Sequence, residues 1–188
     1  MSTLPRLSTE RLIFRPLSIT DAVSLQKLAT DCAIADTTIS IPHPYPDGEA
    51  KRYILKQTTK LKNGNFFVFA IERKLKSDLI GILELHDLEL EHSVAELSYW
   101  LAVAAWGNGY MSEALPPLLS FGFNTLSLNR IHAYHMVRNP ASGKVLQKNG
   151  FELEGLLRQR VRKWGKFEDV KLFSLLRCDW QNNRHSNL

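Results

Sequence analysis

The sequence is poor in cysteine and has no long apolar run. Cys32 and Cys178 are its only cysteines among 188 residues. They form no CxxC pair, and no Cys/His cluster has zinc spacing, so we expect two reduced thiols and no metal. No apolar run approaches the roughly 18 to 20 residues that cross a bilayer. Residues 1–10 lack the basic start and apolar stretch of a secretory signal. We therefore expect a cytoplasmic protein with no membrane partner.

Internal repeats and low-complexity linkers are also absent from the sequence. Its 188 residues fit one domain, since about 150 residues per domain is a common size. Residues 181–188 are polar and have no capping signal, as in a frayed chain end. We predict a single domain over residues 1–180 and a polar tail over residues 181–188.

The positive charge is concentrated in the last quarter of the chain. The net charge is +5, and residues 144–188 carry 10 basic against 5 acidic side chains. The densest basic stretch consists of Arg158, Arg160, Arg162, Lys163 and Lys166. Such a cluster fits nucleic acid, an acidic protein or a phosphorylated ligand, and it also fits a solvated face of one strand and loop. Both interpretations stay open at this point.

The first third of the chain alternates strand and helix signals. Residues 11–15 read as a strand, and Ser18 with Asp21 forms a capping box before an apolar stripe of helical period. A second helix is predicted from near Asp47 to the Asn63-Gly64 pair. Between the two helices, the proline-rich stretch Ile41-Pro-His-Pro-Tyr-Pro46 can be neither helix nor central strand.

The middle of the chain predicts sheet. Residues 66–73 and 79–90 are rich in β-branched and aromatic side chains and are separated by a polar turn, which indicates an antiparallel hairpin. Residues 94–103 alternate as a third long strand. One face of that strand would carry Ala95, Leu97, Tyr99 and Leu101, and the other Glu96, Ser98 and Trp100.

The rest of the chain predicts a strand–helix–strand crossover. We expect a helix over residues 109–124, a strand over 131–137, a helix over 139–149 and closing strands over 151–156 and 170–177. Asn139 would cap its helix, with Pro140 at the first helical position and Gly150 just past the end. The chain is therefore predicted to be α+β with a mixed, mostly antiparallel sheet.

The most informative segment is Trp106-Gly-Asn-Gly-Tyr110, which lies between a predicted strand and a predicted helix. Glycines there let the backbone approach a ligand and direct the amides of the helix start at an anion, which favours phosphate binding. A Walker loop is excluded because Tyr110-Met111 follows Gly109. The dinucleotide fingerprint fails at Ser112, where it needs a third glycine. A plain left-handed turn is the alternative.

The order of motifs along the chain resembles the GNAT acetyltransferase superfamily, and within it the RimJ/RimL type of ribosomal-protein N-acetyltransferases. The similarity covers about 95% of the chain. The motifs that carry it are Thr9-Glu-Arg-Leu-Ile-Phe-Arg-Pro16, Ala95-Glu-Leu-Ser-Tyr-Trp-Leu101, Trp106-Gly-Asn-Gly-Tyr110, Ser112-Glu-Ala114, Asn129-Arg-Ile131, Asn139-Pro-Ala-Ser142 and Asn149-Gly-Phe151. Their conjunction is far more specific than any one of them.

The resemblance implies a central splayed sheet with helices on both faces and acetyl-CoA as co-substrate, with no metal. The coenzyme would lie in the V between the strands at 94–103 and 131–137. The pyrophosphate would meet the glycine-loop amides, and the strand end would pair with the pantetheine amides. The implied coenzyme-binding residues are Leu101, Ala102, Val103, Trp106, Gly107, Asn108, Gly109, Tyr110, Met111, Ser112, Asn139 and Ser142.

Acyl transfer to an amine needs a base near the amine and a hydrogen bond for the leaving sulfur. The resemblance implies Glu96 as the base, directly or through water, with a pKa raised by partial burial. Ser142, in the first turn of its helix, would serve the sulfur. The chain departs from the family at Leu146, where many members carry a tyrosine acid. Two further departures are Ala104 and Asn108, where basic or polar phosphate contacts are usual.

The acceptor is less specified by the sequence. His43, Tyr45, Tyr99 and Trp100 are the candidate acceptor-binding residues. The resemblance favours a protein N-terminal α-amine, such as that of a ribosomal protein, acetylated by direct attack in a ternary complex. The alternatives are a small amine (amino acid, polyamine or antibiotic) and a non-catalytic CoA- or RNA-binding module that uses the basic cluster. A homodimer is left open.

Overall fold

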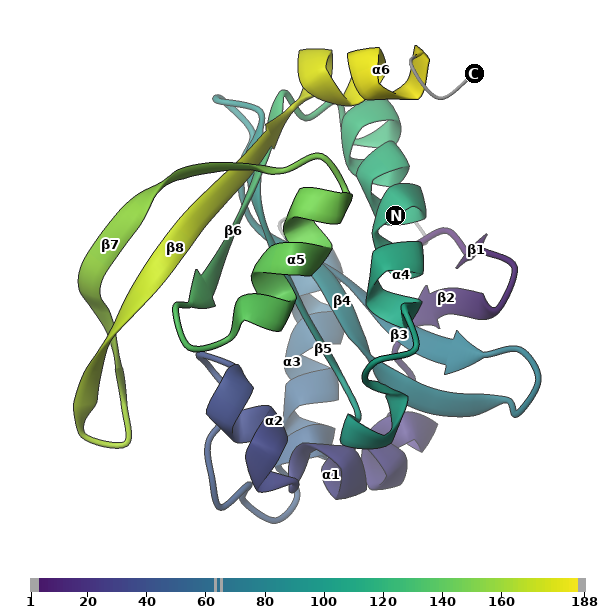
Figure 1. Ribbon diagram of the computed structural model, residues 1–188. Helices are drawn as coiled ribbons and strands as arrows, with labels where there is room; N and C mark the ends of the chain where they lie inside the picture. Colours follow the sequence, from purple (N-terminus) through teal and green to yellow (C-terminus); the bar gives the residue numbers. More distant parts are fainter. Residues whose placement is uncertain (1–3, 63, 65, 186–188) are drawn as a thin grey trace.

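The computed structural model describes residues 4–62, 64 and 66–185, and these form one eight-stranded sheet with helices on both faces (Figure 1). The strands are β1 Leu7–Ser8, β2 Leu12–Pro16, β3 Phe67–Arg73, β4 Asp78–Glu89, β5 Val94–Leu101, β6 Arg130–Met136, β7 Glu152–Lys163 and β8 Lys166–Leu176. Their spatial order is β1-β2-β3-β4-β5-β6-β8-β7, and every neighbouring pair is antiparallel except β5–β6. The predicted α+β class with a mixed, mostly antiparallel sheet is confirmed.

Six α-helices accompany the sheet in the described part of the chain. They are α1 Ala22–Ala29, α2 Cys32–Thr37, α3 Glu49–Lys62, α4 Tyr110–Ser120, α5 Pro140–Lys148 and α6 Arg177–His185. α4 contains Pro116 and Pro117, and it is followed by a π-helical stretch over Phe121–Thr125. No helix within the described ranges has both the length and the apolar character needed to cross a bilayer.

The sheet splits between β5 and β6, the only parallel pair. The two strands pair only where Val94–Glu96 faces Arg130–His132. Beyond these residues β5 continues beside β4 to Leu101, while β6 continues beside β8 to Met136. Because the pairing stops after three residues, the carboxyl halves of β5 and β6 diverge. The expected splayed sheet is therefore present, and α5 lies over the opening (Figure 1).

Two apolar clusters hold helices to the two faces of the sheet. On one face, Phe69 of β3 and Leu97 of β5 pack in the cluster that contains Leu115 of α4. On the other face, Val68 of β3 packs in the cluster that contains Ile54 of α3. Successive strand residues point to opposite faces, so covering both faces buries nearly continuous apolar strands. The predicted alternation along 94–101 is confirmed, since Tyr99 belongs with the first cluster and Trp100 with the second.

Several local signals act as the sequence predicts. Ser18 and Asp21 form the expected capping box before α1. The Asp21 carboxylate also takes two hydrogen bonds of 2.8 Å from Arg15. Burial of Asp21 acts to raise its pKa, but the hydrogen bonds from Arg15 and the Ser18 amide overcome that effect and lower it. Asn139 caps α5 through the amide of Ser142, and α5 ends before the left-handed Gly150.

The structure differs from the sequence predictions at the C-terminal end. The expected tail over residues 181–188 is wrong for residues 181–185, which belong to α6, and 186–188 lie outside the described residues. α6 is anchored by Trp180, which is 9% exposed and whose ring centre lies 5.1 Å from that of Phe123, with the two rings tilted by 34°. β7 and β8 are also longer than predicted, and they form a hairpin that turns at Trp164-Gly165 (Figure 1).

Candidate active site

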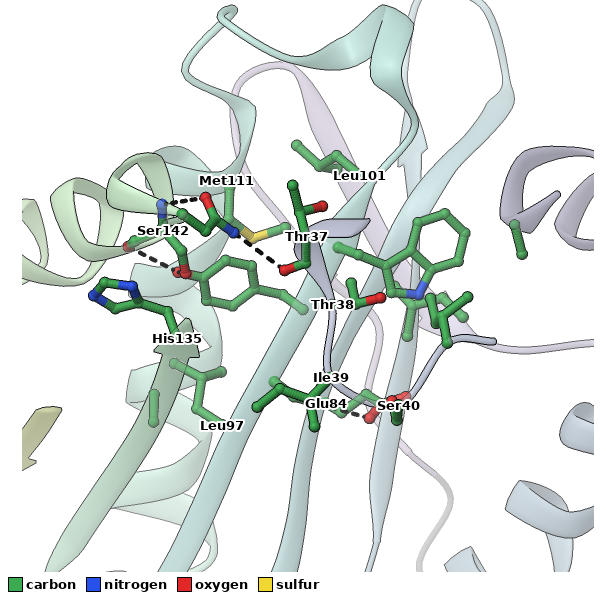
Figure 2. A pocket seen from close by; sticks show the side chains of 18 of the residues that line it. Thr37, Thr38, Ile39, Ser40, Glu84, Leu97, Leu101, Met111, His135 and Ser142 are labelled. Carbon is green, nitrogen blue, oxygen red and sulfur yellow. Dashed lines mark hydrogen bonds between the residues drawn. The ribbon is translucent and has the colours of Figure 1, made fainter. Parts of the chain in front are cut away.

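One cavity of about 1030 Å³ follows the split in the sheet. β4, β5 and β6 line it, together with the starts of α4 and α5, helix α3 and the loop of residues 37–42. Figure 2 shows Ser142 and Met111 at one side of this cavity, Glu84 and Ser40 at the other, and the loop through Thr37–Ser40 between them. A cavity of this size and depth is typical of a small-molecule site.

The glycine loop lies at one end of the cavity and is built for an anion. Gly107 and Gly109 both have a φ of +74°, which side-chain-bearing residues rarely adopt. Gly109 starts α4, and the first helical hydrogen bond joins the Glu113 amide to the Gly109 carbonyl at 3.1 Å. The amides of residues 110–112 therefore precede the helical hydrogen-bond ladder. Together with the positive end of the helix dipole, these amides suit a phosphate.

Arg11, the residue just before β2, brings a positive charge to this loop. Its guanidinium lies 4.6 Å from the Tyr110 ring centre, and its Nη2 would be 3.8 Å from a Cβ at Gly109. Glu113 holds it through a 2.6 Å ion pair and also accepts a 2.5 Å hydrogen bond from Thr9. Burial acts to raise the pKa of Glu113, but the hydrogen bonds from Thr9 and Arg11 lower it overall. The sequence analysis missed Arg11 because it lies about a hundred residues from the loop.

Part of the expected coenzyme-binding set already has partners within the protein. The Ala102 amide donates to the Ile80 carbonyl at 2.7 Å, and the Leu101 carbonyl accepts from the Trp106 indole at 2.7 Å. The Asn108 side chain turns back onto the Trp106 carbonyl at 2.8 Å. Ala102, Val103 and Asn108 are not among the residues that line the cavity, whereas Leu101 and Trp106 are. The Ala102 amide and the Leu101 carbonyl therefore already form hydrogen bonds within the protein, and these bonds compete with the expected pairing to pantetheine.

The start of α5 faces the glycine loop across the cavity. The Asn139 side chain accepts from the Ser142 amide at 3.3 Å and donates to the Thr37 carbonyl at 3.2 Å. It thus fixes the helix start and the 37–42 loop at once. Gly107, Gly109, Tyr110, Met111, Ser112, Asn139 and Ser142 all line the cavity, so the structure brings these predicted coenzyme-binding residues together.

Tyr99 lies at the coenzyme side of the cavity and reaches Ser142, although we had expected it among the acceptor-binding residues. Its hydroxyl lies 2.9 Å from the Ser142 Oγ and 3.2 Å from the Ser142 carbonyl. Burial raises the pKa of the Tyr99 phenol, so it is protonated at neutral pH. Leu146 is fully buried in the core. The tyrosine hydroxyl near Ser142 therefore comes from β5 and not from α5.

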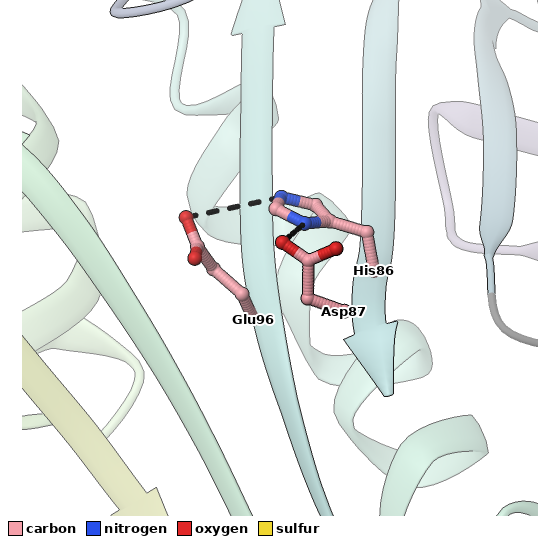
Figure 3. A group of neighbouring side chains, drawn as sticks. All are labelled: His86, Asp87 and Glu96. Carbon is pink, nitrogen blue, oxygen red and sulfur yellow. Dashed lines mark hydrogen bonds and ion pairs between the residues drawn. The ribbon is translucent and has the colours of Figure 1, made fainter. Parts of the chain in front are cut away.

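Glu96 lies where β4, β5 and β6 meet. Its carboxylate lies 3.8 Å from the His86 Nε2 and 3.7 Å from the His132 Nε2, and its side chain is 24% exposed. The Asp87 carboxylate lies 3.1 Å from the His86 Nδ1 (Figure 3). Within the described residues, His86, Asp87 and Glu96 also form a group whose ligand atoms lie within 4.8 Å of one another, a spacing that a cation could use. Glu96 lines the same cavity as Ser142.

The other acceptor candidates separate into two groups. Tyr45 and Trp100 line the cavity, whereas His43 is exposed and lies outside its lining. Burial, followed by the charge of Glu49, raises the pKa of Tyr45 to about 12. We had expected both His43 and Tyr45 to line the acceptor site, but the proline-rich loop turns the two side chains to different environments.

Glu84 of β4 is a cavity residue that the sequence analysis missed. Its carboxylate accepts a hydrogen bond from the Tyr53 hydroxyl and another, of 2.8 Å, from Ser98. Glu84 pairs with Ser98 across β4 and β5, and the next pair on the same face of the sheet is His86 with Glu96. A sequence signal existed, since Glu84 interrupts an otherwise apolar strand, but only the strand register places it beside Glu96.

A sheet that opens at its single parallel pair, with a glycine loop and helix start at the opening, defines a CoA-dependent acyltransferase fold. The family model described as "Acetyltransferase (GNAT) domain" matches residues 11–152. The chain therefore belongs to the GNAT acetyltransferase family. It is an acetyl-CoA-dependent N-acetyltransferase, as the resemblance implied.

Its relatives include an uncharacterized N-acetyltransferase p20 of Bacillus licheniformis, 33% identical over 93% of this chain and 97% of that protein. A spermidine N(1)-acetyltransferase of Vibrio cholerae is 29% identical over 61% of this chain and 65% of that protein. The [ribosomal protein uS5]-alanine N-acetyltransferase of Escherichia coli is 26% identical over 95% of this chain and 94% of that protein.

Among solved structures, RimL, a ribosomal L7/L12 alpha-N-protein acetyltransferase in complex with coenzyme A, shares the fold. Its TM-score is 0.85 at 20% identity, over 92% of this chain and 98% of that chain. Together with the ribosomal-protein relatives, this likeness supports the RimJ/RimL type.

Proposed function

We propose that this protein acetylates the α-amine of a protein N-terminus, with a ribosomal protein as the acceptor class. The observation that carries the proposal is a single cavity with two features. The start of α4, whose free amides suit a phosphate, lies at one end, and the Glu96 carboxylate lies on the wall near the other. A full-length relative that acts on a ribosomal-protein alanine supports this choice of acceptor. An acceptor of this kind is made in the cytoplasm, which is where we place the reaction.

The reaction joins the acceptor nitrogen to the acetyl carbon and breaks the carbon–sulfur bond. A free α-amine has a pKa of about 7.7 to 8.0, so at neutral pH it must lose a proton before it attacks. Glu96 takes this proton, directly or through a water molecule. His86 and His132 flank the Glu96 carboxylate at 3.8 and 3.7 Å.

The sulfur leaves as a thiolate near the start of α5. Ser142 lies in the first turn of that helix, where the dipole favours negative charge, and the Tyr99 hydroxyl orients it. Ser142 donates a hydrogen bond to the sulfur, and the sulfur finally takes a proton from solvent. No acyl-enzyme forms in this scheme, so both substrates occupy the cavity together.

A polyamine is the second candidate acceptor, and the spermidine-acetylating relative favours it.

The third alternative is an RNA-binding module that uses the basic cluster. RNA binding whose affinity does not change with salt concentration would contradict it. Four members of the basic cluster, Arg158, Arg160, Arg162 and Lys166, are exposed on the β7–β8 hairpin. Lys163 is 7% exposed and donates to the Ile41 carbonyl at 2.6 Å. It is therefore not part of the exposed basic cluster, although we had expected it there.

Glu96→Gln tests the proposal most simply. The substitution removes the proposed base and keeps the size and shape of the side chain. We therefore expect kcat with an N-terminal peptide to fall by about 10²- to 10⁴-fold at pH 7, the usual contribution of a general base. The affinity for acetyl-CoA should not change, because the glycine loop lies at the other end of the cavity. Steady-state rates and calorimetric binding of acetyl-CoA measure the two quantities.

The matched control is Glu89→Gln, which changes an exposed carboxylate on β4 outside the cavity. It should keep both quantities within twofold of the wild type. A Glu96→Gln enzyme that retains a third or more of the wild-type kcat would contradict the role of Glu96. A wild-type enzyme that acetylates spermidine but no peptide N-terminus would favour the polyamine acceptor.

A further inference from the structure

We infer that Glu84 is the anionic anchor that binds the acceptor's ammonium group beside Glu96, an inference that rests on the proposed amine acetylation. The site would take a primary amine in its protonated form. Glu84 would bind and orient the acceptor, while Glu96 takes the proton.

The hydrogen bonds of Glu84 fit an anchor better than a base. Its two carboxylate oxygens each accept from one hydroxyl, that of Tyr53 on α3 and that of Ser98 on β5. These hydrogen bonds hold the carboxylate in one orientation, and each of its oxygens can accept a further hydrogen bond from a ligand. The pKa of Tyr53 is raised well above its ordinary value, first by burial and then by the charge of Glu84, so the phenol stays a donor. Glu84 is thus a carboxylate that two donors hold in place on the cavity wall.

The strand register places this charge next to the proposed base. Glu84 faces Ser98 across β4 and β5, and Glu96 is the diagonal neighbour, two residues along β5. Such diagonal neighbours on one face of an antiparallel pair lie about 7 to 8 Å apart. An ammonium group that donates a hydrogen bond of about 3 Å to each of two carboxylates joins oxygens up to about 6 Å apart. The two glutamate side chains therefore need to incline toward each other by about 1 to 2 Å to share it. Both carboxylates line the cavity.

The surroundings of Glu84 leave it available to a ligand. No ion pair of Glu84 occurs among those of the described residues, although Arg52, Lys56 and Lys60 of α3 also line the cavity. Arg52 pairs with Glu49 at 2.6 Å, and the Lys60 ammonium lies 4.3 Å from the Phe66 ring centre. The cavity therefore holds a carboxylate with two neutral donors and no cation bound to it in the described part of the chain. A cationic acceptor would supply the missing counter-charge.

Calorimetry with the CoA-bound enzyme at pH 7 tests the anchor without turnover. The probes are a tetrapeptide amide that begins with Ala, its N-acetylated form, and spermidine. The wild type should bind the free-amine peptide at least 10-fold more tightly than the acetylated one, because only the free amine is a cation. Glu84→Gln should weaken binding of the free-amine peptide at least 10-fold and change that of the acetylated peptide by less than twofold.

Glu89→Gln is again the matched control and should leave both affinities unchanged. A Glu84→Gln protein that loses affinity equally for the two peptides would overturn the anchor, since that result indicates a structural role only. So would a wild type that binds neither the peptide amine nor spermidine. If spermidine binding depends on Glu84 but no peptide N-terminus is acetylated, the anchor stands and the proposed peptide acceptor fails.

In turnover assays the same substitution should raise KM for the acceptor more than it lowers kcat. A residue that only braces α3 against the sheet would lower the midpoint of thermal unfolding and would not discriminate between charged and neutral probes. Ser98→Ala leaves Glu84 with the Tyr53 donor alone and should weaken binding of the free-amine peptide by less than Glu84→Gln does. An effect of Ser98→Ala larger than that of Glu84→Gln would contradict the anchor.

Discussion

At the scale of single residues, the cavity takes polar groups from strands that are distant in sequence. Tyr99 lies on β5 but acts on Ser142 of α5, 43 residues away. Its protonated phenol is 2.9 Å from the Ser142 Oγ, and the position on α5 where many family members carry a tyrosine is the buried Leu146. One hydroxyl can thus be supplied from a neighbouring element when its usual position is part of the core.

Tyr99→Phe removes this hydroxyl while keeping the ring. We expect the free energy of unfolding to fall by about 1 kcal/mol, the usual value of one hydrogen bond, and kcat to fall about 10-fold, a drop equal to about 1.4 kcal/mol in the activation barrier. Because Tyr99 acts through Ser142, the effects of Tyr99→Phe and Ser142→Ala on kcat should not add in the double variant. Additive effects would indicate that the two side chains act separately. Urea denaturation and steady-state rates provide the readouts.

The sequence predicted the parts of the site that depend on local chain geometry. The positive φ of Gly107 and Gly109, the N-cap at Asn139 and the place of Ser142 all follow from neighbouring residues. Arg11 and Glu84 were missed because their positions depend on strand pairing. His43 was misplaced because a proline-rich loop carries no periodicity that fixes the direction of a side chain.

At the scale of elements, β6, β7 and β8 are joined by a polar contact of Glu154. Its carboxylate pairs with both terminal nitrogens of Arg130 on β6, one at 2.6 Å, and accepts from Ser174 of β8 at 2.6 Å. The hydrogen bond from Arg130, followed by that from Ser174, lowers the pKa of Glu154 to about 2 from an ordinary value of 4.5. This contact links the strand that borders the cavity to the outer hairpin.

The low pKa of Glu154 makes a prediction about acid stability. A carboxylate with a depressed folded-state pKa stabilises the fold above its unfolded pKa and loses that contribution as the pH falls through its folded pKa. The difference in free energy of unfolding between the wild type and Glu154→Gln should therefore be full above about pH 5, shrink between pH 4.5 and about 2, and vanish below. Urea denaturation across this range measures it.

High salt should reduce the same difference, because Glu154 is 36% exposed and its ion pair is screened. Glu152→Gln, an exposed change on the same strand, is the control and should show no such pH dependence. A difference between the wild type and Glu154→Gln that stays constant from pH 6 to pH 2 would contradict the account.

Most element types followed from sequence periodicity, but strand lengths did not. The predicted strands over 151–156 and 170–177 are parts of β7 and β8, which extend to a turn at Trp164-Gly165. Charged side chains dominate the missing portions, residues 157–163 and 166–169, so no apolar alternation marks them. Cross-strand pairing and the left-handed Gly165 make the hairpin, and neither is visible in a hydrophobic pattern.

At the scale of the whole molecule, the fold works by opening one sheet at its only parallel pair. The crossover through α4 makes β6 parallel to β5, and the pairing ends after three residues. α4 and α5 then present their N-terminal ends to one side of the opening, and Glu84 and Glu96 lie on the strand face that packs toward α3. One cavity thus connects the helix starts that suit an anionic coenzyme with the carboxylates that we propose bind the acceptor amine.

The measurement that tests this account most directly is the initial rate of acetyl transfer at varied concentrations of acetyl-CoA and of an N-terminal peptide, with mass spectrometry of the product. Two substrates that share one cavity should give double-reciprocal lines that intersect, and the acetyl group should lie on the peptide's α-amine. Parallel lines, which indicate an acyl-enzyme, or the absence of acetylated peptide at millimolar substrate would contradict the account.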